Sequence, residues 1–248
     1  MSHRAVSTRS RTRSTSRRVA GKRGQAARID LARAGAPRWR RRKEARPAEL
    51  LDAALEVFVE RGYAGTRLED VARRAGITKG AMYHYFENKE ALFKAMIRAK
   101  VVENIAAIEQ IVQDFTGSAR DMLLMLMTRW WQRVVEGESG GIAKLMMSEA
   151  GSFPEVAAFF HDEVMQRNTK LFEHAMKLGM ARGEFRRMDP AVAVRLSIAP
   201  MLVAALWRHS FRPCVGDTPF DTRQYFEAHL DLFLNGLLSP EAREARHD

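Results

Sequence analysis

The chain has 248 residues, and 46% of them are apolar, which is enough to build a sizeable core in one or two domains. Its single cysteine, Cys214, excludes an internal disulfide framework and a zinc site made of four cysteines. The net charge of +11 is uneven, because residues 1–46 contain 16 Lys or Arg and two acids, whereas the remaining residues contain 25 basic and 28 acidic side chains. The basic character therefore belongs to the N-terminal segment, and the rest of the chain is close to neutral.

Residues 1–45 are predicted to form a disordered basic tail. They are rich in Arg, Ser, Thr and Ala and show no sustained apolar period, so they cannot bury enough surface to offset the entropy of ordering. Three interpretations stay open for this tail: a basic arm that lies along DNA phosphates, an organelle transit peptide, or a start site assigned too far upstream. The segment lacks the apolar stretch of a secretion signal.

A first amphipathic helix is predicted over about residues 47–61. Pro47 suits the first helical turn, where its missing N–H has no partner to lose, and Gly62 suits a left-handed C-terminal cap. One apolar stripe at helical spacing is formed by Leu51, Ala54, Leu55 and Phe58.

Two short helices follow, at about 67–75 and 79–85. The Thr66 and Glu69 pair predicts a capping box for the first of them, and Thr78 is expected to cap the second. Across these two helices, a small residue, a glycine and an apolar residue occur at the spacing of a helix-turn-helix. Ala72 permits close approach of the helices, Gly76 permits the turn, and Met82 anchors the last helix on the other two.

The sequence around this motif resembles the TetR family of transcriptional regulators. The matching residues are Gly62, Tyr63, Thr66, Leu68, Glu69, Asp70, Val71, Ala72, Ala75, Gly76, Ile77, Thr78, Lys79, Gly80, Met82, Tyr83, His84, Tyr85, Phe86, Asn88, Lys89, Glu90, Ala91 and Leu92. The resemblance implies an all-α fold with a DNA-binding head over 46–92, a helical ligand-binding and dimerisation body over 93–240, and a C-terminal tail over 241–248.

The same resemblance implies that the third helix lies in the major groove of double-stranded DNA. Its DNA-facing positions would be Lys79, Gly80, Ala81, Tyr83 and His84, with the capping residue Thr78 beside them. Phosphate contacts, which fix register and not sequence choice, would come from Thr66, Arg67, Tyr83, Tyr85 and Lys89.

The body is predicted to be helical throughout. A connector helix should carry the apolar positions between Leu92 and Ile108, and Ser152 and Glu155 form a second apparent capping box with Pro154 in the first turn. The further helices are expected at about 120–136, 142–149, 154–178, 189–209 and 218–237, with Asp189-Pro190 and Thr218-Pro219 opening the last two. The apolar run from Ala191 to Trp207 is shorter than a membrane span and contains Arg195, so a helix buried on more than one side is predicted.

In the family, the last two helices form a four-helix interface, which implies a homodimer and a palindromic operator. The body should also hold an unidentified small-molecule effector, because methionines and aromatic residues are frequent before these two helices. The candidate lining residues are Met125, Trp130, Trp131, Met146, Phe159, Phe172 and Met176.

No catalytic, cofactor or metal site is predicted, because the histidines are scattered and no phosphate-binding glycine loop follows a strand. The favoured function is a cytoplasmic, nucleoid-associated repressor that a ligand releases from its operator, with no membrane association. The alternative is an architectural DNA-coating protein whose basic tail dominates binding, and an enzyme is a remote third hypothesis.

Overall fold

The computed structural model describes residues 38–216, 220–240 and 242, with side chains from Pro47 onward. The described part of the chain is helical and contains no β-strand; one isolated antiparallel bridge joins Phe185 to Leu238. The all-α prediction is therefore confirmed. Residues 38–45, predicted as the end of a disordered tail, are helical; residues 1–37 and most of 241–248 lie outside the described residues.

The N-terminal head consists of α1 (Arg38–Gly65), α2 (Leu68–Arg74) and α3 (Lys79–Tyr85). The prediction that helix α1 begins at Pro47 is wrong, because the helix starts at Arg38 and contains Pro47. The exposed Pro47 keeps a helical φ, so its ring does not end the helix. The glycine predictions hold: Gly62 has φ of 76° and Gly76 has φ of 65°, a region that disfavours side chains with a Cβ.

The predicted capping box at the start of α2 is wrong. Arg67 is the N-cap residue and makes no side-chain capping bond. The hydroxyl of Thr66 instead donates to the carbonyl oxygen of Gly62 at 2.7 Å, and only 2% of Thr66 is exposed. The kink at Gly62 leaves helix-end carbonyls without intrahelical partners, and the Thr66 hydroxyl satisfies one of them.

Replacing Thr66 with valine should lower the free energy of unfolding by about 1–2 kcal/mol, because the partly buried Gly62 carbonyl would lose its donor while the side-chain volume is nearly unchanged. Thr66→Ser keeps the hydroxyl and is the matched control, which should lose less. Urea denaturation followed by circular dichroism measures both variants. No loss for valine together with a loss for serine would show that the methyl group, and not the hydroxyl, stabilises this corner.

The body begins with a continuous helix made of α4 (Lys89–Ile97), the π-helical segment η2 (Arg98–Val102) and α5 (Glu103–Gln113). This helix contains the predicted connector. The remaining elements are α6 (Ala119–Trp130), η3 (Trp131–Glu136), α7 (Ser139–Glu149), α8 (Pro154–Phe160), η4 (His161–Met165), α9 (Gln166–Ala181), α10 (Pro190–Leu206), η5 (Trp207–Phe211), α11 (Arg212–Val215) and α12 (Thr222–Leu237).

The helix starts in the body bear out one of the two predicted caps. Phe153 precedes α8 as its N-cap and makes no side-chain capping bond, so the second capping box is wrong, although Pro154 does occupy the first turn. Asp189 caps α10 as expected, because its carboxylate accepts from the Ala191 N–H at 2.8 Å. The last helix begins at Thr222 after the capping residue Asp221; the start predicted at 218–219 lies outside the described residues.

An aromatic cluster joins the head to the body. Phe93 from α4 packs edge-on against Phe58 and Tyr63 of α1, at ring-centroid distances of 5.2 and 5.3 Å. Phe153, just before α8, packs against Tyr63 at 4.7 Å. Because Phe58 and Phe93 are fully buried, the connector helix is anchored in the core of the head.

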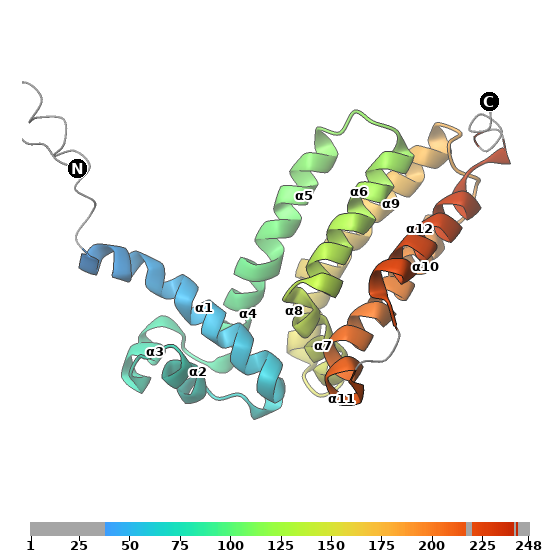
Figure 1. The fold of residues 1–248 in the computed structure, drawn as a ribbon. Helices are drawn as coiled ribbons and strands as arrows, with labels where there is room; N and C mark the ends of the chain where they lie inside the picture. Colours follow the sequence, from blue (N-terminus) through green and yellow to red (C-terminus); the bar gives the residue numbers. More distant parts are fainter. Residues whose placement is uncertain (1–37, 217–219, 241, 243–248) are drawn as a thin grey trace, which may run out of the picture. The chain divides into compact units, whose positions relative to one another are not determined.

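Within the body, α9 packs against α6 and α10, and α10 and α12 run side by side (Figure 1). The helix Pro190–Val215 is long and apolar enough to cross a membrane by length and composition, a test that core helices also pass. One of its faces is buried, but Val192, Leu196 and Val203 are 44%, 54% and 57% exposed. Within a single chain α10 packs against α9, η3, α7 and α12, and the face that carries Val192, Leu196 and Val203 is left uncovered by the other described elements.

Candidate nucleic-acid interface and ligand cavity

Helix α3 presents a polar face to solvent and an apolar residue to the core. Thr78 caps the helix as predicted, because its hydroxyl oxygen accepts from the Ala81 N–H at 3.2 Å. Met82 is fully buried against the first two helices. Ala81 is half-buried, and the other predicted DNA-facing positions are exposed: Thr78, Lys79, Gly80, Tyr83, His84 and Tyr85.

Glu69 of α2 holds two of these side chains in place. The Lys79 ammonium lies 2.8 Å from a Glu69 carboxylate oxygen, and the Tyr83 hydroxyl donates to the same oxygen at 3.3 Å. The hydrogen bond from Lys79 is the main reason that the pKa of Glu69 lies below its ordinary value. An ionised Glu69 thus orients Lys79 and Tyr83 on the surface of the head.

Two predicted phosphate contacts have structural roles instead. Thr66 is buried, with its hydroxyl turned toward Gly62. The Lys89 ammonium donates to the carbonyl oxygen of Tyr63 at 2.7 Å and lies 4.5 Å from the centroid of the Tyr63 ring. Burial lowers the pKa of Lys89. Neither side chain is free for DNA in this structure, whereas Arg67 is exposed at the start of α2.

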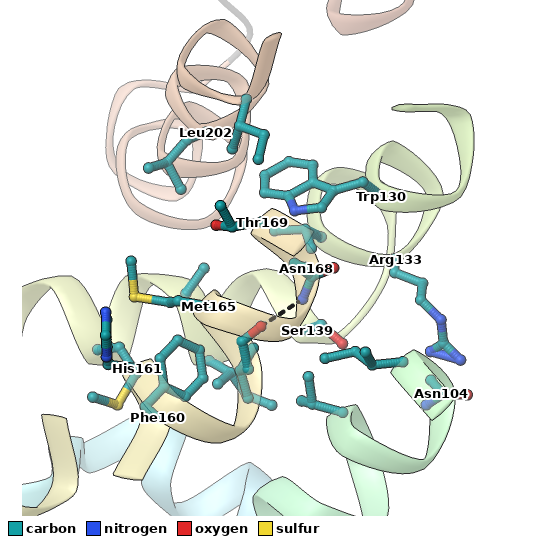
Figure 2. A pocket seen from close by; sticks show the side chains of 18 of the residues that line it. Asn104, Trp130, Arg133, Ser139, Phe160, His161, Met165, Asn168, Thr169 and Leu202 are labelled. Carbon is teal, nitrogen blue, oxygen red and sulfur yellow. Dashed lines mark hydrogen bonds between the residues drawn. The ribbon is translucent and has the colours of Figure 1, made fainter. Parts of the chain in front are cut away.

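The body encloses an apolar cavity of about 510 Å³. It lies between the continuous helix of α4, η2 and α5 and the helices α6 to α10, and its walls are mostly aliphatic, aromatic and methionine side chains. Figure 2 shows Trp130 and Leu202 at one side of the cavity, and Phe160, His161 and Met165 at another. A cavity of this size and character is typical of small-molecule sites.

Three of the seven predicted lining residues border this cavity: Trp130, Met146 and Phe172. The prediction is wrong for the other four, which pack elsewhere. Trp131 is buried, stacks on Phe226 at 4.4 Å, and donates its indole N–H to Glu136 at 3.1 Å. Phe159 lies beneath the cations of Lys94 and Arg98, Met176 is fully buried in the core, and Met125 packs partly buried against that core.

The cavity wall also contains polar and charged residues that the sequence pattern did not predict. They are Lys100, Asn104, Arg129, Arg133, Ser139, His161, Asn168 and Thr169. A sequence signal existed for two of them, because Arg129 and Arg133 are one helical turn apart in a stretch rich in apolar residues. Among the residues that the structure describes, no group of three or more His, Cys, Asp or Glu side chains could hold a metal ion.

The short capped helix α3, anchored by a buried Met and exposed on its polar face, places the chain among the helix-turn-helix DNA-binding proteins. Comparison with protein families identifies which helix-turn-helix family the chain belongs to. Residues 50–96 match the model of bacterial regulatory proteins of the tetR family, and residues 112–214 match a tetracyclin repressor-like C-terminal domain. The chain belongs to the TetR family of DNA-binding transcriptional regulators, and it is not an enzyme.

The chain resembles known regulators over most of its length. It is 28% identical over 202 residues to the transcriptional repressor KstR2 of Rhodococcus jostii, covering 80% of this chain and 94% of that protein. The structure of the ketosteroid transcriptional regulator KstR2 of Mycobacterium tuberculosis matches with a TM-score of 0.60 at 23% identity, covering 83% of this chain and 98% of the other. FadR of Bacillus subtilis, solved with stearoyl-CoA, matches with a TM-score of 0.60 at 18% identity, covering 77% and 98%.

Proposed function

We propose that the protein is a homodimeric repressor that binds a palindromic operator in the cytoplasm and is released from it by a small apolar ligand. The observation that supports this most directly is the position of the cavity. Its wall includes Lys100, Val101, Asn104, Ile105 and Ile108, which belong to the same continuous helix that carries Phe93 into the core of the head. A ligand that prefers a different position of this helix would therefore also change the position of the head.

The exposed apolar face of α10 supports the homodimer. Val192, Leu196 and Val203 lie on this face, and Leu232 on the neighbouring helix α12 is 74% exposed. Covering such a patch with the same patch of a second chain gives a two-fold interface. A two-fold dimer presents two α3 helices to successive major grooves, about 34–36 Å apart, and thus requires a palindrome.

The DNA contacts in this proposal come from the exposed face of α3 and from Arg67. Gly80 and Ala81 allow the helix backbone to approach base edges, and His84 can donate or accept a hydrogen bond there. Lys79, Tyr83 and Tyr85 would contact phosphates on either side of the groove.

An architectural DNA-coating protein is the second candidate, and the charge of the basic segment 1–46 favours it. Residues 47–90 contain six basic and eight acidic side chains, so the head itself supplies little long-range attraction for DNA. Sequence-tolerant coverage of DNA would support this second candidate, and one preferred site with a large specificity ratio would exclude it.

Operator release tests the proposal. Labelled operator is bound to the full-length protein and titrated with apolar small molecules, including long-chain acyl-CoA thioesters and steroids, because relatives are described with stearoyl-CoA and as a ketosteroid regulator. Fluorescence anisotropy measures DNA affinity, and calorimetry measures cavity occupancy. At least one occupant should weaken DNA binding by about 5- to 150-fold.

The matched control is Ala143→Phe, which narrows the cavity and lies on α7, outside the proposed DNA-binding helix α3. This variant should keep its DNA affinity and lose the response to the ligand. Ligands that occupy the cavity without any change in DNA affinity would contradict the proposed induction.

A further inference from the structure

The apolar cavity continues into a second, polar pocket of about 450 Å³. The two pockets share five lining residues: Lys100, Asn104, Arg133, Ser139 and Ile142. The polar pocket also reaches Leu55 of α1, so it borders the DNA-binding head. Figure 2 shows Arg133 and Asn104 together at one end of the apolar cavity, away from Phe160 and Met165.

Positive charge at this junction is poorly compensated. Arg133 is half-buried, and neither Arg133 nor Arg129 forms an ion pair with a carboxylate in the part of the chain that the structure describes. Burial, and then the nearby charge of Arg129, lower the pKa of Arg133. The apolar cavity has no acidic lining residue among those described, and Glu138 is the one acid that lines the polar pocket. A half-buried guanidinium without a partner favours an anionic ligand.

Irregular helical turns line the apolar cavity, and two of them reach the junction. Lys100 lies in η2, Arg133 in η3 and His161 in η4, so three π-helical segments contribute to the cavity wall. Such segments are rare within α-helices and occur frequently at functional sites. Two of the three, η2 and η3, contribute Lys100 and Arg133 to the junction, whereas His161 of η4 lies at the other end of the apolar cavity.

Lys100 connects this junction to the head. Its ammonium forms an ion pair with Asp52 of α1, while the same side chain lines both pockets. Asp52 is more exposed than Lys100, with 57% against 29% of the side chain accessible. A ligand anion beside Arg133 would therefore compete with Asp52 for Lys100.

We propose that the site takes an amphipathic acid, whose apolar body fills the cavity and whose anionic group pairs with Arg133 and Lys100, in place of Asp52. This inference rests on the proposed function for its regulatory meaning, but the binding site itself can be tested without DNA. It also supplies a coupling step, because the ligand would remove an ion pair between the connector helix and the head.

The test compares two fluorescent probes that differ in one group. Anilinonaphthalene sulfonate carries an anion on an apolar body, and N-phenylnaphthylamine is the same body without the sulfonate. The sulfonate should bind the full-length protein more tightly than the neutral probe. Arg133→Gln should weaken sulfonate binding about tenfold or more and leave the neutral probe unchanged, because a charge-assisted hydrogen bond is lost. Arg186→Gln, at an exposed arginine outside both pockets, is the control and should change neither.

Two further variants test whether the probes bind in the cavity and whether the anion competes with Asp52 for Lys100. Ala143→Phe should weaken both probes, since it narrows the shared apolar cavity. Asp52→Asn should strengthen sulfonate binding severalfold without changing the neutral probe, because Lys100 is then free of its carboxylate partner. No saturable sulfonate binding, equal dissociation constants for the two probes, or an unchanged sulfonate affinity in Arg133→Gln would overturn the anionic site. An unchanged affinity in Asp52→Asn would overturn the competition. If these variants contradict the anionic site but a ligand still releases the protein from its operator, the proposed function would still hold.

Discussion

Glutamate at both Leu196 and Val203 is expected to convert the dimer into monomers and to weaken binding to a palindromic operator by about a thousandfold. Both side chains are more than half exposed on one face of α10 in the single chain. In the proposed dimer each glutamate would be buried without a partner, which is strongly unfavourable. A monomer then binds one half-site and loses the avidity of two linked sites, which is worth roughly 10²- to 10⁴-fold.

Sedimentation velocity measures the oligomeric state of this variant, and fluorescence anisotropy measures its DNA affinity. Lys177→Glu is the charge control, because Lys177 is exposed on α9 and pairs with Glu173 of the same helix. The control should remain dimeric and bind the operator normally. A dimer that persists in the double variant would place the interface away from the exposed face of α10.

Removing Lys79 and Tyr83 together is expected to weaken operator binding by about a hundredfold while the fold remains intact. Glu69 positions both side chains on the exposed face of α3. In the proposed complex each one would supply a charged or hydroxyl donor for a phosphate, and the loss of each should cost about 1–2 kcal/mol. Because both residues are surface-exposed, their truncation to alanine should change the free energy of unfolding by less than about 1 kcal/mol.

The measurement is an operator titration at constant salt concentration, accompanied by urea denaturation. Lys177→Ala is the matched control for the loss of an exposed lysine. Full DNA affinity in the Lys79→Ala, Tyr83→Ala variant would mean that another surface binds the phosphates. A large loss of stability would mean that the two side chains support the head rather than contact DNA.

The head could be predicted from sequence because its signals are local. The positive φ of Gly62 and Gly76, the Thr78 cap and the burial of Met82 each depend on a few neighbouring residues, and all are observed. Thr66 shows the limit of such reasoning. Its spacing to Glu69 is that of a capping box, but a kink at Gly62 offers the hydroxyl a nearer carbonyl.

The cavity was harder to predict because helical periodicity does not show which neighbour a side chain meets. Trp130 and Trp131 are adjacent tryptophans in the same apolar stretch, yet Trp130 lines the cavity and Trp131 stacks on Phe226 in α12. That difference depends on contacts between helices almost a hundred residues apart in the chain. The charged lining residues could not be predicted for a related reason. The sequence does not show that Lys100 pairs with Asp52 or that it lines the same pocket as Arg133.

We infer that this protein is a sequence-specific dimer that binds DNA with α3. The most direct test selects genomic DNA fragments bound by the full-length protein at near-physiological salt and sequences them. We expect one enriched palindrome with half-sites about one helical turn apart. Diffuse enrichment without a motif would contradict this claim, and would favour a DNA-coating protein governed by its basic N-terminal segment.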